Sequence, residues 1–155
     1  MSYAEIEEFS EDDSLLKKEV HRFAEEVIRP ASIEIDRMLS DKYQEKITDR
    51  DSPYWKVMKE MKKLGYHRAI FPEEAGGAGL SPRKICILYE ELSWGSSGFA
   101  MALGVDFIPL FFAILSFSNY LRENLIDPWL ADEEAKFQGC WAITEPEHGS
   151  DPILA

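Results

Sequence analysis

A run of twenty nearly all-apolar residues, Gly98 to Phe117, constrains the fold of this chain more than any other feature. A helix of about 20 apolar residues can cross a bilayer, but it seldom carries a charge at its centre. Here Asp106 and Pro109 lie in the middle of the run, and no basic cluster flanks it. The run therefore predicts two buried helical pieces that meet at residues 106–109, with a membrane span as the weaker alternative.

The composition fits one globular domain. The 155 residues are 45% hydrophobic and 30% charged, which is enough apolar material for one core. Seventeen Lys and Arg stand against 29 Asp and Glu, for a net charge of -12. Such a surface repels phosphates, which excludes nucleic acid as a partner. The stretch from Met1 to Asp13 is acidic and lacks the basic region of a signal peptide, so we expect a cytoplasmic protein.

Helix-start signals occur at several serines, which can accept a hydrogen bond from the backbone of the first turn. They are Ser10, in the capping box Ser10–Asp13, and the pairs Ser52-Pro53, Ser81-Pro82 and Ser118-Asn119. Gly65 is expected to end one helix in the left-handed conformation, and Pro30 to end or kink another because it lacks an N–H. The glycines between Gly76 and Gly79 predict a tight connection, since no Lys-Ser or Lys-Thr follows them as in a phosphate-binding loop.

Apolar residues at helical spacing predict which side chains lie in the core. In the C-terminal half they are Phe107, Phe111, Phe112, Phe117, Leu121, Leu125 and Trp129. Cys86 and Cys140 lie far apart in apolar surroundings and are expected to be buried, reduced thiols. His21 and His67 have no partner at the spacing of metal ligands, so we expect no metal site.

The pattern changes near the C-terminal end. Phe137 to Ile143 is rich in aromatic, small and β-branched residues, which predicts a β-strand. A lone strand has no partner for its backbone groups, so this strand is expected to belong to a second, β-containing unit. The predicted organisation is an all-α domain of about five or six helices over residues 1–135. The start of a β-domain is expected over residues 136–155.

Segments in a fixed order resemble the acyl-CoA dehydrogenase family. The most specific is the run from Ala142 to Asp151, AITEPEHGSD, which resembles the family signature T-E-P-x-x-G-S-D at the end of a strand. The others are Phe23–Pro30 in the first helix, the glycine-rich loop Phe71–Ser81, and Tyr89–Leu92 in the helix that follows. The chain departs from the family in lacking a short G-x-x-x-Q-K segment before the strand.

The resemblance implies the N-terminal helical bundle of an FAD-dependent enzyme that removes hydrogens from the α- and β-carbons of an acyl-CoA thioester. It assigns the flavin contacts to Trp141, Ile143, Thr144, Gly149 and Ser150, and it places Ser150 near the bound CoA ester as well. It also implies that the helices around the phenylalanine stripe wall the acyl-chain cavity. The family is typically homotetrameric, so a homo-oligomer is expected.

In the family the catalytic carboxylate is a glutamate in a later part of the polypeptide, and no glutamate here matches its position. We therefore assign no catalytic residue and expect no turnover from these 155 residues alone. Two alternatives stay open. One is a flavin-dependent oxidase or monooxygenase of the same fold. The other is a non-enzymatic helical module that serves only in association.

Overall fold

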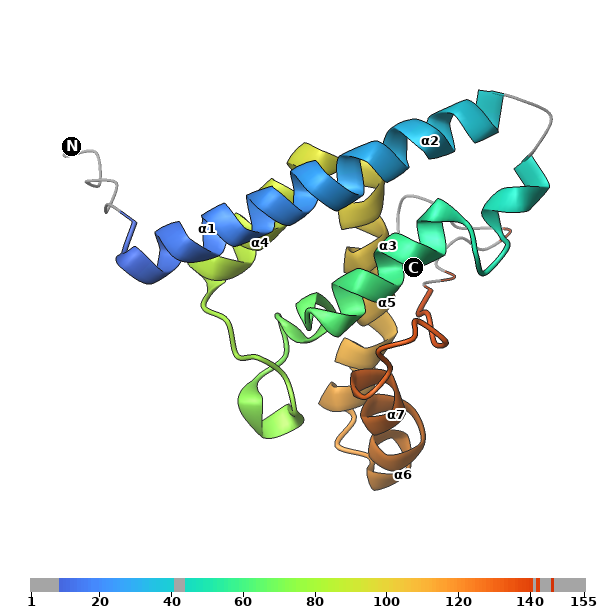
Figure 1. The fold of residues 1–155 in the computed structure, drawn as a ribbon. Helices are drawn as coiled ribbons and strands as arrows, with labels where there is room; N and C mark the ends of the chain where they lie inside the picture. Colours follow the sequence, from blue (N-terminus) through green and yellow to red (C-terminus); the bar gives the residue numbers. More distant parts are fainter. Residues whose placement is uncertain (1–8, 41–43, 141, 143–145, 147–155) are drawn as a thin grey trace.

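The computed structural model describes residues 9–40, 44–140, 142 and 146, and all regular structure among them is helical. The elements are α1 (Glu11–Phe23), η1 (Ala24–Ile28), α2 (Arg29–Ser40), η2 (Gln44–Ile47), α3 (Pro53–Lys63), η3 (Tyr66–Arg68), η4 (Glu73–Ala75), α4 (Pro82–Gly95), α5 (Ser97–Leu115), α6 (Asn119–Leu121), η5 (Arg122–Ile126) and α7 (Asp127–Leu130). In Figure 1, α1, η1 and α2 form one continuous rod that packs on α4 and α3, and α5 runs away from it toward α6 and α7. The prediction of an all-α fold is confirmed.

The rod passes through Pro30 without ending, so the predicted helix end at this residue is wrong. The five residues before Arg29, Ala24–Ile28, form a π-helical turn, and α2 continues through the proline. A π-turn places one extra residue in the helix and shifts the hydrogen-bond pattern, which lets the chain accommodate a residue without an N–H. Gly95 of α4 approaches the rod at this turn, where a Cβ on it would lie 3.0 Å from the Cβ atoms of Ala24 and Ile28.

The serine caps largely form as predicted. In the capping box the backbone N–H of Asp13 donates to Ser10 Oγ (3.1 Å), and the Ser10 N–H donates to Asp13 Oδ2 (3.2 Å). The hydroxyls of Ser81 and Ser118 cap α4 and α6 with one bond each, accepted from the backbone N–H of Lys84 and of Leu121. Ser52 precedes α3 but does not cap it, because its hydroxyl donates instead to the carbonyl oxygen of Ile47 (2.7 Å).

Both glycine predictions are confirmed. Gly65 follows α3 with φ 76°, the left-handed conformation that favours glycine. The loop between η4 and α4 is a tight connection, because a Cβ on Gly77 would overlap the backbone carbonyl of Phe71.

Helix α5 is a single helix of 19 residues, so the predicted break at residues 106–109 is wrong. Pro109 lies inside the helix, and Asp106 is fully buried. The charge does not interrupt the helix because a lysine of α3 lies beside it. Helix α5 is long and apolar enough to cross a membrane. About a third of its most apolar 18-residue segment is buried inside the molecule. The core helix of a globular protein meets the same criteria.

Buried apolar side chains form two clusters. The rod core lies between the rod, α3, α4 and the first half of α5, and its members are Val20, Ala24, Ile28, Val57, Met58, Met61, Ala69, Leu88, Leu92, Phe99, Ala100, Leu103 and Ala135. The distal core is smaller and lies between the second half of α5 and the α6–α7 segment. Its members are Phe71, Leu110, Ala113, Ile126, Trp129 and Leu130.

Several side chains predicted to be buried are exposed instead. They are Phe111, Phe112, Phe117, Leu125, Cys86 and Cys140, whereas Trp129 is buried and Phe107 and Leu121 pack partly against the distal core. The second half of α5 is covered on one side only, so helical spacing alone could not tell which of its apolar stripes faces the core. Both cysteines are free thiols, as predicted, but they lie at the surface.

Candidate functional site

The predicted flavin contacts, Trp141, Ile143, Thr144, Gly149 and Ser150, lie outside the described residues. The described chain that leads to them is the connecting strip, which we define as residues 135–139. It was predicted to begin a β-strand at Phe137, but the structure has no strand over residues 137–140. Side chains of the helical domain, rather than a neighbouring strand, supply the hydrogen-bond partners of the strip.

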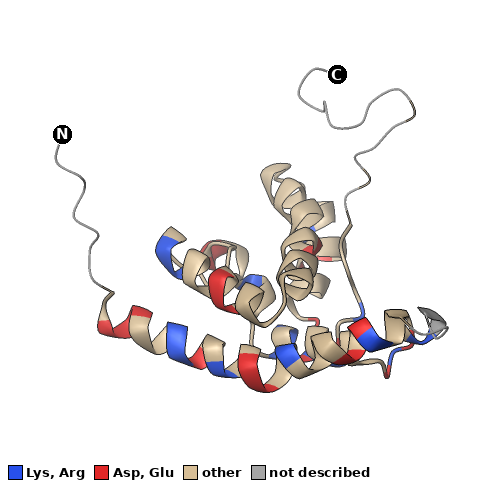
Figure 2. Cartoon of the chain, turned by 90° about the horizontal axis from the view of Figure 1, so that it is seen from above, with Lys and Arg blue, Asp and Glu red and all other residues tan. Residues whose placement is uncertain are grey.

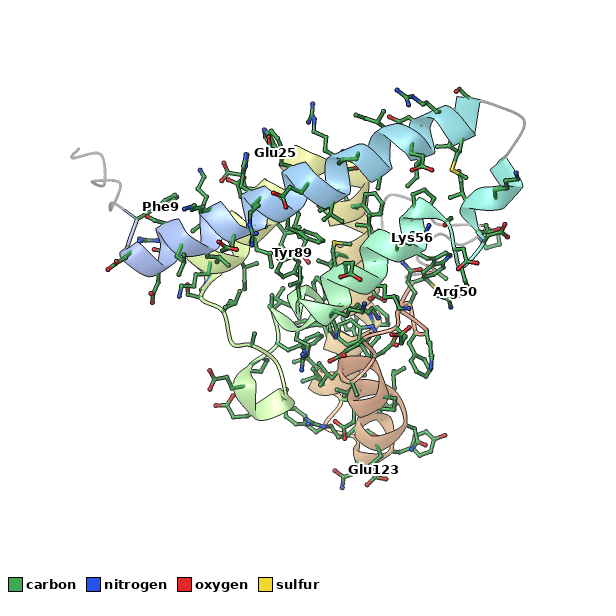
Figure 3. The ribbon with its side chains drawn as sticks, viewed as in Figure 1. Phe9, Glu25, Arg50, Lys56, Tyr89 and Glu123 are labelled. Atoms are coloured by element: carbon green, nitrogen blue, oxygen red, sulfur yellow. The ribbon has the colours of Figure 1, made fainter. Side chains whose placement is uncertain are left out.

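The first half of the strip is held by Arg50, which lies before α3 (Figure 3). Its guanidinium donates to the carbonyl oxygens of Ala135 (2.6 Å) and Lys136 (3.4 Å). The same guanidinium lies 4.0 Å from the centre of the Trp55 ring, a cation–π contact that fixes its orientation. Ala135 has φ 51°, a conformation unusual for a residue other than glycine, and it is buried in the rod core.

The middle of the strip is held by Lys62 and Asp132. Lys62 Nζ donates to the carbonyl oxygen of Phe137 (2.7 Å), and Asp132 Oδ2 accepts from the Phe137 N–H (2.8 Å). The two side chains also pair with each other, with 3.4 Å between Lys62 Nζ and Asp132 Oδ2. Burial by itself would raise the pKa of Asp132, but backbone N–H groups of Phe137 and Lys136 and the charge of Lys62 hold that pKa below its usual value.

The end of the strip is held by Asp106 on α5. Asp106 Oδ1 accepts hydrogen bonds from the backbone N–H of Gly139 and from Trp129 Nε1. Its other oxygen, Oδ2, lies 3.3 Å from Lys62 Nζ, which places two fully buried charges side by side. Gly139 crosses α5 so closely that a Cβ on it would overlap the backbone carbonyl of Asp106 and come within 2.7 Å of Pro109 Cγ.

His67 lies next to this network in the buried interior. Its ring packs edge-on against Trp129, with 5.0 Å between the ring centres, and Nε2 lies 3.3 Å from the carbonyl oxygen of Leu130. Burial lowers the pKa of His67 to about 4, and the nearby charge of Lys62 acts in the same direction. His67 is therefore neutral near pH 7, which fits the packing role expected from the sequence.

The comparisons with known proteins match this architecture. The family model described as "Acyl-CoA dehydrogenase, N-terminal domain" matches residues 10–120, which is more than half of the chain. The chain belongs to the acyl-CoA dehydrogenase family. The match covers the helices from α1 to the start of α6, so the resemblance seen in the sequence motifs is confirmed.

Two curated members of the family illustrate how far the similarity extends. The chain is 28% identical to a glutaryl-CoA dehydrogenase of Desulfococcus multivorans over 144 residues, which cover 92% of this chain and 34% of the relative. It is also 28% identical to the mitochondrial short-chain specific acyl-CoA dehydrogenase of Sus scrofa, over 93% of this chain and 32% of the relative. The chain thus spans about a third of the length of these acyl-CoA dehydrogenases.

A solved structure shows the same fold. The structure of a glutaryl-coenzyme A dehydrogenase in complex with glutaryl-CoA superposes on all of this chain and on 35% of its own length, with a TM-score of 0.67 and 28% identity. The helical arrangement in Figure 1 is therefore the N-terminal part of the acyl-CoA dehydrogenase fold.

In this member of the family, one side of α5 is apolar and open. Met101, Phe111, Phe112 and Leu115 are exposed along the helix, and Phe117 just beyond it is 90% exposed with φ 51°. We call these five residues the apolar face. Exposed apolar side chains of this kind can line the pocket of an apolar ligand or pack on another protein surface.

A cavity of about 480 Å³ lies between η4 and the end of α5, with mostly apolar walls that include Ala113, Ile114 and Ile126. None of its lining residues belongs to the connecting strip. Within the described part of the chain, no three His, Cys, Asp or Glu side chains are grouped to hold a metal ion.

Lys62, Arg50 and Asp132 were not predicted from the sequence to support the site. Asp106 was predicted only to mark a break in a helix. The usable signal was a lone carboxylate in a long apolar run, because a buried charge needs a partner. The sequence did not show that the partner would be a lysine 44 positions earlier on another helix.

Proposed function

We propose that the chain forms the N-terminal helical domain of an FAD-dependent acyl-CoA dehydrogenase, which introduces a double bond between the α- and β-carbons of an acyl-CoA thioester. The observation that carries the proposal is the family match over residues 10–120, followed in the sequence by the flavin-binding signature from Thr144 to Asp151. Glutaryl-CoA, short-chain acyl-CoA or another thioester would each be consistent with this domain.

The described residues fit a neighbouring flavin and acyl chain. Cys140 and Ala142, which follow the strip where the proposed flavin-binding stretch begins, are exposed, and α5 presents its apolar face. When bound, FAD accepts the β-hydrogen of the substrate as hydride. In this proposal Thr144 and Ser150 contribute hydroxyls and Gly149 a close backbone approach, Trp141 and Ile143 contact the ring region, and Ser150 also lies near the CoA ester.

In the proposed reaction, this chain orients the acyl chain of the substrate and excludes water. The acyl chain has to lie between the flavin and the carboxylate that removes the α-proton, and small displacements at such a site reduce the rate strongly. An apolar wall on α5 would hold the acyl chain and keep water away from the reacting carbons. The proton-accepting glutamate is assigned to a part of the family's polypeptide that this chain does not match.

Thr144 provides the direct test in the complete flavin-loaded dehydrogenase. Thr144→Ala removes one hydrogen bond, with an expected cost of about 0.5–1.5 kcal/mol in flavin binding. We expect reduced FAD content or an altered flavin spectrum in this variant. Unchanged content and spectrum would indicate that residues 144–151 form a plain surface turn.

The same preparation separates the rival functions. Flavin absorbance of the purified protein distinguishes a dehydrogenase from a non-enzymatic association module. If the reduced flavin transfers its electrons to oxygen rather than to an electron-acceptor dye, the protein is an oxidase or monooxygenase. The 155 residues by themselves are expected to bind FAD weakly or not at all, because they supply only part of its contacts. We also propose a homo-oligomeric, cytoplasmic protein, to be tested by sedimentation and cell fractionation.

A further inference from the structure

We infer that Asp106, Lys62 and Arg50 are positioning residues that fix where the flavin-binding stretch begins relative to α5. This inference rests on the proposed function for its link to flavin. It rests on the structure alone for the positioning itself.

Each residue of the connecting strip makes a hydrogen bond with a side chain of the helical domain. Arg50 holds the carbonyls of residues 135 and 136, and Lys62 with Asp132 holds both backbone groups of residue 137. The Gln138 side chain donates to the hydroxyl of Tyr54 (2.6 Å), and Asp106 accepts from the N–H of residue 139. Five consecutive residues with fixed partners leave the strip little freedom to slide along α5.

Burying the charges of this network costs more free energy than an apolar connection between the helices would. Lys62 and Asp106 are both 0% exposed, and burying two charges is expensive unless each makes several good contacts. An apolar core would join the helices more cheaply. Buried polar groups are instead suited to selecting one register, because any other register leaves a charge without partners.

The strip crosses α5 at Gly139. The absence of a side chain lets the strip approach the backbone of Asp106, and a one-residue slip would bring Gln138 or Cys140 to that point. Glycine and the buried carboxylate together therefore define a single crossing point. Since Asp106 is on the helix that carries the apolar face, the network ties the flavin-binding stretch to the wall of the proposed acyl cavity.

Amide hydrogen exchange in the 155-residue chain tests the positioning. Asp106→Leu should speed exchange of the Gly139 N–H by about 10- to 100-fold relative to amides of the rod core, as expected for loss of a hydrogen bond to a charged group. Asp106→Asn keeps an acceptor oxygen and should retain the protection. Val20→Ala, a truncation in the rod core far from the strip, controls for general destabilisation and should leave Gly139 protected relative to the core.

Equal protection of Gly139 in Asp106→Leu and in Val20→Ala would overturn the inference. If Asp106→Leu does not fold, Gly139→Ala takes its place, because it leaves the ion pairs intact and blocks only the close approach. An unchanged rate at residue 139 in that variant would equally overturn the inference.

The flavin link is tested in the complete dehydrogenase. Asp106→Leu should shift the flavin spectrum or reduce FAD content, with Asp106→Asn and Val20→Ala close to wild type. A flavin that is unaffected in Asp106→Leu would reject the link although Gly139 is released. A wild-type protein with no flavin and no dehydrogenation would reject the proposed function instead, while the exchange result would still decide the positioning.

Discussion

Two regions of the molecule, the rod with α4 and the distal half around the end of α5, differ in what they bury and what they expose. The rod buries a continuous apolar core and displays charged residues along its length, as Figure 2 shows. Its main ion pairs join a buried carboxylate to a partly exposed cation, such as Glu91 with Lys17 (3.5 Å). The distal half has a smaller core, an ion pair in its interior, and the apolar face on its outside.

The contrast shows which part of the chain completes its own packing. A helix pair that covers its apolar stripe and keeps the cations of its ion pairs in contact with solvent needs no further partner. Helix α5 leaves phenylalanines exposed while its buried aspartate pairs with a buried lysine of α3, an arrangement suited to contacts and geometry rather than to stability alone. The following five predictions test this difference between the two regions, from the largest expected effect to the smallest.

The largest effect is expected from removing the buried cation. Lys62→Met leaves Asp106 and Asp132 without their positive partner, which should lower the free energy of unfolding by about 3–5 kcal/mol. Lys63→Met, one residue further on the same helix, removes only a surface pair with Glu60 and should cost less than about 1 kcal/mol. Urea unfolding of both variants measures the difference, and similar losses would show that the interior pair is not special.

Truncating a buried side chain of the rod core should lower the free energy of unfolding far more than truncating a side chain of the apolar face. Leu92 is fully buried, so Leu92→Ala should cost about 2–5 kcal/mol. Leu115 is half exposed on the apolar face, and Leu115→Ala should stay within about 0.5 kcal/mol of wild type. A large loss at Leu115 in a monomeric sample would mean that the distal half covers this side chain in solution.

Acid should destabilise the distal half because His67 becomes protonated. Its pKa is lowered to about 4 from 6.5, so between these values the unfolded chain binds more protons than the folded one. The stability contribution is therefore complete above pH 6.5 and is lost as the pH falls toward 4, by on the order of 3 kcal/mol. His67→Phe should flatten the pH dependence of unfolding over this range. An unchanged slope would mean that His67 titrates normally.

Self-association should arise from the apolar face and not from isolated apolar residues on the rod. Phe111→Ser with Leu115→Ser should shift the isolated chain toward monomer, since burying one such side chain is worth about 1.5–3 kcal/mol. Leu15→Ser with Leu39→Ser changes two comparably exposed side chains on the rod and serves as the control.

Salt is the second variable in this experiment. The net charge of -12 opposes association, and salt screens it beyond about 8–10 Å, so wild-type association should grow with ionic strength. Sedimentation across a salt series measures this. A wild-type chain that stays monomeric at high salt would favour a self-contained helical module.

The smallest effects are expected at the helix caps. Ser10→Ala removes a reciprocal capping box at the start of the rod and should cost about 1 kcal/mol. Ser118→Ala removes a single, longer bond of 3.4 Å before the short α6 and should cost less. Thermal unfolding of the two variants ranks them, and the reverse order would show that the distal half depends more on its caps than the rod does.

Local signals in the sequence were reliable where a residue acts on its own backbone. The caps at Ser10, Ser81 and Ser118 and the left-handed Gly65 follow from chemistry within a few residues, so they could be predicted. The family followed from motifs whose order along the chain is fixed. The helix end expected at Pro30 and the break expected at residues 106–109 are absent because a π-turn and a distant lysine compensate for a missing N–H and a buried charge.

The candidate site also has a part that the sequence predicted and a part that only the structure showed. The residues assigned to flavin were named by resemblance and remain predictions, because they lie outside the described residues. The strip that leads to them could not be predicted, since its partners Arg50, Lys62 and Asp106 come from separate elements. A strand was expected over Phe137–Ile143 because composition reports the extended conformation but not which groups will satisfy its backbone.

By itself, the sequence determined a helical acyl-CoA dehydrogenase domain with its caps, its turns and its overall charge, because these depend on residue type and short spacing. Only the tertiary structure decided which side of α5 is buried, that Cys86 and Cys140 are exposed, and that Lys62 and Asp106 share the interior. The physical reason is that burial belongs to pairs of surfaces far apart in the chain. A buried charge is tolerated only where packing brings its partner within a few ångströms.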